Sequence, residues 1–77
     1  MASSKTTLRF RKAGDINRDN ALFELLSDDT PILDVGFADD GTFEIAFNEA
    51  IGGVIMPWTQ LQDWIEKGKE MAERDRA

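Results

Sequence analysis

Three carboxylates spaced ten residues apart, Glu24, Asp34 and Glu44, are the side chains of this 77-residue chain best placed to do chemistry. Each lies in a segment that favours a β-strand, and the alternation of apolar and polar residues directs all three to one face of the predicted sheet. Carboxylates grouped in this way can hold Mg²⁺, which takes one or two of them together with substrate phosphates. They can equally form a docking surface for a basic partner.

The residue types on which most enzymes rely are missing. The chain contains no histidine and no cysteine, which excludes the ordinary structural zinc site, a thiol nucleophile and a histidine base. Gly52 and Gly53 form an isolated pair without the spacing of a phosphate-binding loop. We therefore expect no enzyme activity, no metal and no cofactor, and we interpret the three carboxylates as a partner-binding surface.

The charge is divided unevenly along the chain. Residues 1–20 carry five basic and two acidic side chains, whereas residues 21–77 carry four basic and thirteen acidic ones, and the whole chain has a net charge of −6. An acidic body attracts a cationic protein and repels phosphate, which argues against nucleic acid as a partner. Two other interpretations of the carboxylates remain open: they are merely solvated, or Arg9 and Arg11 of the N-terminal arm neutralise them.

Hydrophobic periodicity predicts an α+β fold. A basic arm, residues 1–20, is expected to be partly disordered or to add an edge strand through its alternating residues 7–11. A single acidic domain follows over residues 21–77, as an antiparallel β-meander of three to four strands with one C-terminal amphipathic helix packed on one face. Its predicted strands span about residues 21–27, 32–38 and 42–48, with residues 54–56 as a short final strand or an extended lead-in to the helix, and its helix spans about residues 60–74.

Side-chain parity sets the register of the hairpin formed by the strands at 32–38 and 42–48. Their apolar faces match only if Phe37 lies opposite Phe43 and Val35 lies opposite Ile45. The Asp-Asp-Gly sequence between them then forms a three-residue loop, in which the glycine adopts the left-handed conformation.

The predicted helix has a capping-box pattern, Thr59 and Gln62, which places its start near Gln60. Gly68 lies within the apolar stripe of this helix, where close approach to the sheet and a tolerated weak spot would each explain a glycine. Trp58 is expected to cover one end of the core, with an interface role as the alternative. The predicted core joins the helix stripe to the inward residues of the strands: Phe23, Leu25, Leu33, Val35, Phe37, Phe43, Ile45 and Phe47.

Three apolar residues fall on the outer face of the sheet, away from the helix, under the same register: Leu22, Leu26 and Ile32. An apolar patch on an open sheet face often marks a contact site. We therefore add them to the three carboxylates as predicted partner-binding residues. A symmetric homodimer through this patch is the alternative function, since two-fold dimers are the commonest oligomers.

The sequence shows no membrane or targeting segment. No apolar run approaches the ~20 residues that a membrane-spanning helix needs. The N-terminus has no apolar stretch after its charges, so it is not a secretory signal. The lack of cysteine fits a reducing compartment, and we expect a cytoplasmic protein without a membrane partner.

A longer pattern runs from Leu22 to Glu73: LFEL, then PILDVGFADDGTFEIAF, AIGG and LQDWIEKGKEMAE. It resembles small bacterial immunity-type proteins of toxin–immunity systems, including those of contact-dependent growth inhibition. The resemblance covers most of the acidic domain but not the basic arm. It implies a protein that binds and blocks a cognate toxin, often a nuclease with a basic substrate groove, and that has no catalytic residues of its own. It implies no particular contact residues, because these differ between subfamilies.

Overall fold

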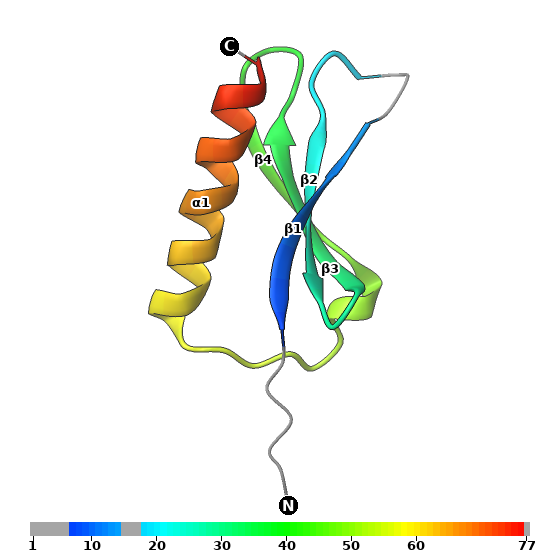
Figure 1. The fold of residues 1–77 in the computed structure, drawn as a ribbon, viewed down its shortest axis with the longest axis vertical. Helices are drawn as coiled ribbons and strands as arrows, with labels where there is room; N and C mark the ends of the chain where they lie inside the picture. The colour runs from blue at the N-terminus through cyan, green and yellow to red at the C-terminus, as the bar shows by residue number, and fades with distance from the viewer. Residues whose placement is uncertain (1–6, 15–17, 77) are drawn as a thin grey trace, which may run out of the picture.

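The computed structural model describes residues 7–14 and 18–76, and it shows a four-stranded antiparallel sheet with one long helix against it (Figure 1). The prediction of an α+β meander with a C-terminal helix is confirmed. The strands lie side by side in chain order: β1 (Leu8–Ala13), β2 (Leu22–Ser27), β3 (Thr30–Phe37) and β4 (Phe43–Phe47). A short 3₁₀ helix and a loop then lead to the long helix: η1 (Glu49–Ile51) and α1 (Trp58–Arg76).

β1 forms one edge of the sheet, next to β2, and it includes most of the alternating stretch at residues 7–11. Its register places Phe10 opposite Leu25 and Arg11 opposite Glu24. The partial disorder predicted for the arm is not tested at its first six residues, which lie outside the described residues. The N-terminal arm therefore contributes a strand to the same sheet as the acidic domain.

The hairpin of β3 and β4 has the register that parity predicts. Phe37 pairs with Phe43, and Val35 pairs with Ile45. Gly41 has a φ of +92°, the left-handed conformation expected at the end of the loop. This part of the fold follows directly from the alternation and the turn residues.

Aspartates at the two hairpin turns bind the backbone. Asp28 and Asp29 both have positive φ, at 49° and 71°, and the N–H of Thr7 donates to Asp28 Oδ1 at 2.9 Å. In the β3–β4 turn, the N–H of Thr42 donates to Asp40 Oδ1 at 2.9 Å, and this bond lowers the pKa of Asp40. Asp40 thus stabilises its own turn, as aspartates at such positions commonly do, whereas Asp28 links the β2–β3 turn to Thr7, just before β1.

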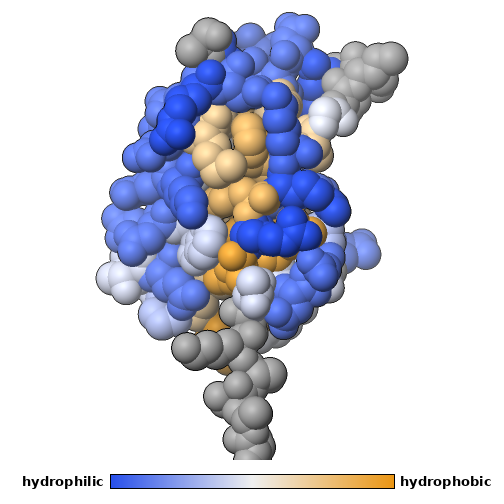
Figure 2. Space-filling model, in the orientation of Figure 1, coloured by the Kyte–Doolittle hydropathy of each residue, from blue (hydrophilic) through white to orange (hydrophobic). Residues whose placement is uncertain are grey.

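The helix α1 packs on one face of the sheet, mainly over β2 and β3. Gly68 is buried at this contact. The helix lies so close to the sheet that a Cβ at position 68 would be only 2.7 Å from both Phe10 Cζ and Val35 Cγ2. Close approach to the sheet therefore explains the glycine. Figure 2 shows apolar side chains between α1 and β1, bordered on both sides by hydrophilic ones. The buried core beneath consists of these residues: Phe23, Leu25, Ile32, Leu33, Val35, Phe37 and Ala72.

The start of α1 differs from the prediction. The helix begins at Trp58, because the N–H of Leu61 already donates to the carbonyl of Pro57 at 3.1 Å. Proline at the entrance of a helix has a suitable φ and lacks only a hydrogen bond that would not be made there. Thr59 consequently lies inside the first turn. Of the two forms predicted for residues 54–56, the short strand is wrong, because these residues belong to the loop that leads into α1.

Ile32 is buried, so its predicted place in an outer apolar patch is wrong. Leu25 pairs with Leu33, whereas Leu26 pairs with Pro31, which leaves Ile32 without an opposite residue. An extra residue of this kind is a β-bulge, and it redirects the local side chains. Ile32 accordingly joins the core at 1% exposure.

Leu26 is also fully buried, which removes the second residue of the predicted patch. Its partners in the neighbouring strands are Arg9 and Pro31, so its side chain lies between these two residues. Leu22 is half-buried, and a Cβ on Gly36 would lie 2.9 Å from its Cδ2. A homodimer through an exposed patch of Leu22, Leu26 and Ile32 is therefore not available to this fold.

Candidate functional site

The three predicted carboxylates do lie on one face of the sheet, the face away from α1, which we call the carboxylate face. Glu24 pairs directly with Asp34 between β2 and β3. Glu44 of β4 lies opposite Gly36 of β3, so it is a diagonal neighbour of Asp34, which lies two residues from Gly36 on β3. No three acidic, histidine or cysteine side chains among the described residues are grouped closely enough to hold a metal ion.

One of these carboxylates is neutralised within the chain. Arg11 donates to Glu24 Oε1 from Nη2 at 2.6 Å and from Nε at 2.9 Å. Arg9 turns away to the β2–β3 turn, where its Nη2 lies 2.8 Å from Asp29 Oδ1. Among the residues that the structure describes, internal neutralisation thus applies to Glu24, through Arg11, and does not extend to Asp34 or Glu44.

Asp34 is the unusual member of the carboxylate face. Its Oδ1 is buried and has no hydrogen-bond partner, and no ion pair of the described residues includes Asp34. Burial raises the pKa of Asp34, and the neighbouring negative charge of Glu24 raises it further. A carboxylate held without a cation is destabilising in the free protein, and a cation supplied by a partner would relieve it.

We expect Asp34→Asn to stabilise the isolated protein at neutral pH by roughly 0.2–1 kcal/mol, the size of a cross-strand pair effect. The raised pKa means that the folded state binds more protons than the unfolded state, so stability falls as the pH rises through the raised value. The gain should therefore be full at neutral pH and vanish as the pH falls to 3.8, the ordinary value.

Thermal melts of both proteins across this pH range test the Asp34 prediction. Glu44→Gln is the control, because it removes an exposed charge from the same face and should change stability less. A destabilised Asp34→Asn protein would mean that another group of the chain compensates the carboxylate.

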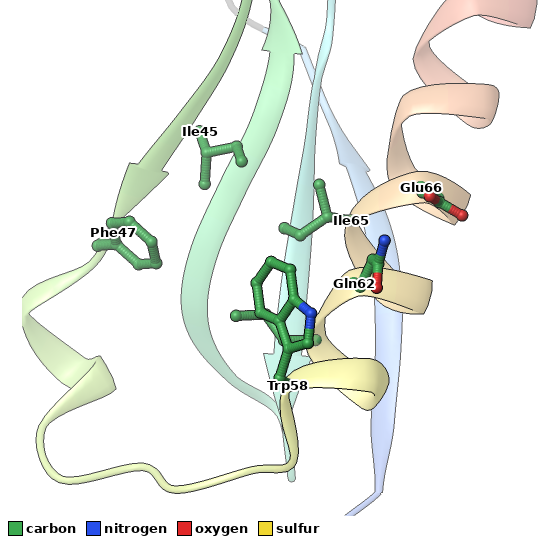
Figure 3. A pocket seen from close by; sticks show the side chains of 7 residues that line it. Ile45, Phe47, Trp58, Gln62, Ile65 and Glu66 are labelled. Atoms are coloured by element: carbon green, nitrogen blue, oxygen red, sulfur yellow. The ribbon is translucent and has the colours of Figure 1, made fainter.

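A second surface lies on the other side of the sheet, in an open groove of about 380 Å³ between β4 and α1. Figure 3 shows Ile45 and Phe47 of β4 on one side of it, and Ile65 and Trp58 of α1 on the other. Phe47 is 65% exposed and Trp58 is 69% exposed. The lining is apolar except for Gln62 and Glu66 of α1, a composition typical of a protein contact site.

The groove exists because α1 packs mainly over β2 and β3 and leaves Ile45 and Phe47 of β4 exposed. The predicted burial of Ile45 and Phe47 in the core is wrong for this reason, as is the predicted covering role of Trp58. Alternation shows which side chains share a face, but it does not show how far a helix reaches across that face. Val54 and Ile55 of the loop before α1 are also exposed.

Beside the groove, the main chain of β4 has hydrogen-bonding groups that no other described strand pairs with. The N–H of Ala38, directly after β3, donates to the carbonyl of Thr42, directly before β4. The N–H of Asn48, directly after β4, donates to the carbonyl of Ile32 in β3. Because the bonded positions of an antiparallel pair alternate, the even-numbered residues of β4 face β3. The N–H and C=O groups of the odd-numbered residues, Phe43, Ile45 and Phe47, therefore point away from the sheet, at its edge.

Comparison with known proteins leaves the two surfaces to be interpreted on their geometry. No family model, no curated protein and no solved structure matches this chain. In the part of the chain that the structure describes, no helix is long and apolar enough to cross a membrane.

Proposed function

We propose that this protein acts by binding other proteins and not by catalysis. The observation that carries the proposal is the groove of β4 and α1, where Phe47 and Trp58 remain more than half exposed. Large aromatic side chains left open beside an unpaired strand edge are typical of contact surfaces. The carboxylate face offers a second contact surface on the opposite side of the sheet.

We further propose that the carboxylate face binds a basic partner, as expected for an immunity-type protein that neutralises a bacterial toxin. Asp34 and Glu44 form no ion pair with any described residue, and half-buried Leu22 packs against Gly36, which lies opposite Glu44. Glu24 contributes less, because Arg11 already pairs with it. The net charge of −6 favours fast association with a cationic domain. This role places the protein in the cytoplasm.

A binding measurement tests this function, with the protein encoded by the open reading frame next to this chain's own gene as the expected toxin partner. Asp34→Asn should weaken that binding by about 2–5 kcal/mol if Asp34 forms a buried ion pair with the partner. Asp63→Asn, the same change at an exposed position on α1, is the matched control and should have little effect. Equal losses for the two variants would indicate a general charge effect and argue against a site at Asp34. A chain that binds neither the neighbouring product nor itself would contradict the whole proposal.

A further inference from the structure

We propose that the occupant of the β4 edge and its groove is a second copy of this chain, paired antiparallel through β4 about a two-fold axis at Ile45. The inference rests on the proposed binding function and names the partner of the groove. It leaves the carboxylate face of each copy free.

The register follows from which groups of β4 point outward. With the axis at Ile45, each Ile45 pairs with its counterpart, and Phe43 of one copy pairs with Phe47 of the other. All three outward residues then find partners, giving about six backbone hydrogen bonds across the interface. A register centred on Ala46 would leave Phe43 without a strand residue opposite, because β4 ends at Phe47.

Charge also selects this register. Glu44 is the single charged residue of β4, and centring the axis on it would place two carboxylates directly opposite each other, which is destabilising. With the axis at Ile45, Glu44 lies opposite Ala46 of the second copy. β4 has no lysine, no proline and no register shift, which are the features that normally protect an exposed strand edge from pairing.

The exposed apolar surface is large enough for a dimer. Phe47 and Trp58 alone expose roughly 250 Å², given that aromatic side chains offer about 150–250 Å² each. With Ile45, Val54, Ile55 and the strand edge, each copy can contribute about 500 Å². Two such contributions reach the ~1,000 Å² that a specific interface needs.

Sedimentation at micromolar concentrations tests the dimer with the full chain. We expect reversible dimerisation, weakened at least about 30-fold by Ile45→Pro. Proline removes the outward N–H of Ile45 from each copy without removing a bond to β3, because Ile45 does not donate to β3. Ile45→Val is the matched control: it has as many side-chain carbon atoms as proline and keeps the N–H, so its dimer constant should stay within about threefold.

Cross-linking tests the register and does not depend on the proline variant folding. The chain has no cysteine, so a single Ile45→Cys change gives one thiol per copy. Paired residues at a hydrogen-bonded position have Cα atoms about 5.5 Å apart, within disulfide range, so this variant should form a disulfide dimer. Phe47→Cys, at a more exposed position, should not, because its counterpart lies about four residues farther along the strand.

A monomer at all accessible concentrations would overturn the inference and leave the groove to a different protein. Equal cross-linking of the two cysteine variants would overturn the register. Binding of the neighbouring product by a strictly monomeric chain would contradict only the dimer and would leave the proposed function intact.

Discussion

Gly68→Leu should abolish most of the stability of this fold. Even the single Cβ of alanine would lie 2.7 Å from Phe10 Cζ and from Val35 Cγ2, closer than real Cβ atoms come to their neighbours. The Phe10 ring can shift, but Val35 is β-branched and fully buried, so it has little freedom to move. We expect Gly68→Ala to cost a net ~1 kcal/mol, since overpacking of ~1–3 kcal/mol outweighs a gain of ~1 kcal/mol in helix propensity.

Leucine at position 68 would add three more carbon atoms to the same contact, and we expect a loss above about 3 kcal/mol. A domain of this size has few kcal/mol to lose, because it buries only ~60% of its unfolded surface. Urea unfolding of the variants measures these losses. Gly53→Ala is the control, because a Cβ there would meet nothing within 4 Å, and its effect should stay within about 0.5 kcal/mol. A Gly68→Ala protein as stable as the parent would show that the glycine is only a weak spot.

Ile32→Asp should also destabilise the protein strongly, lowering its free energy of unfolding by about 3–5 kcal/mol. The change removes a side chain that is 1% exposed in the core and leaves a carboxylate in its place without a described cation nearby. Ile55→Asp is the matched control: Ile55 is 95% exposed in the loop before α1, so in melts at concentrations too low for the proposed dimer the same substitution should cost less than about 0.5 kcal/mol.

Thermal melts followed by circular dichroism compare Ile32→Asp with Ile55→Asp. Because the substitution is the same, a difference in melting temperature reports the burial of the position. If Ile32 lay on an accessible outer patch, the two variants would have the same melting temperature. A folded Ile32→Asp protein that loses self-association would restore the outer patch as the dimer surface and contradict the bulge.

The hairpin of β3 and β4 is the part of this fold that local sequence patterns predict best. Its register depends on side-chain parity, and its loop depends on a glycine at positive φ, so Phe37 and Phe43 could be paired from the sequence alone. The three carboxylates were assigned to one face by the same parity. Such inferences need only neighbouring residues along the chain.

The parts that could not be predicted depend on longer-range packing. The bulge at Ile32 breaks parity within β3, and only Pro31, which lacks an N–H, hints at an irregular ladder. The open groove depends on where α1 crosses the sheet. That crossing is set by the close contact of Gly68 with β1 and β3, two strands distant in the sequence, and hydrophobic periodicity carries no information about it.

The order of elements along the chain matters during synthesis. All four strands precede α1, so they leave the ribosome before the helix that covers them exists. Neighbouring strands are also neighbours in the sheet, which lets hairpins form as soon as each pair emerges. Until α1 follows, the side chains of Leu25 and Val35 stay open to water, and β4 offers its free edge to other nascent chains. On a crowded polysome, newly made copies would therefore meet while their sheets are still uncovered.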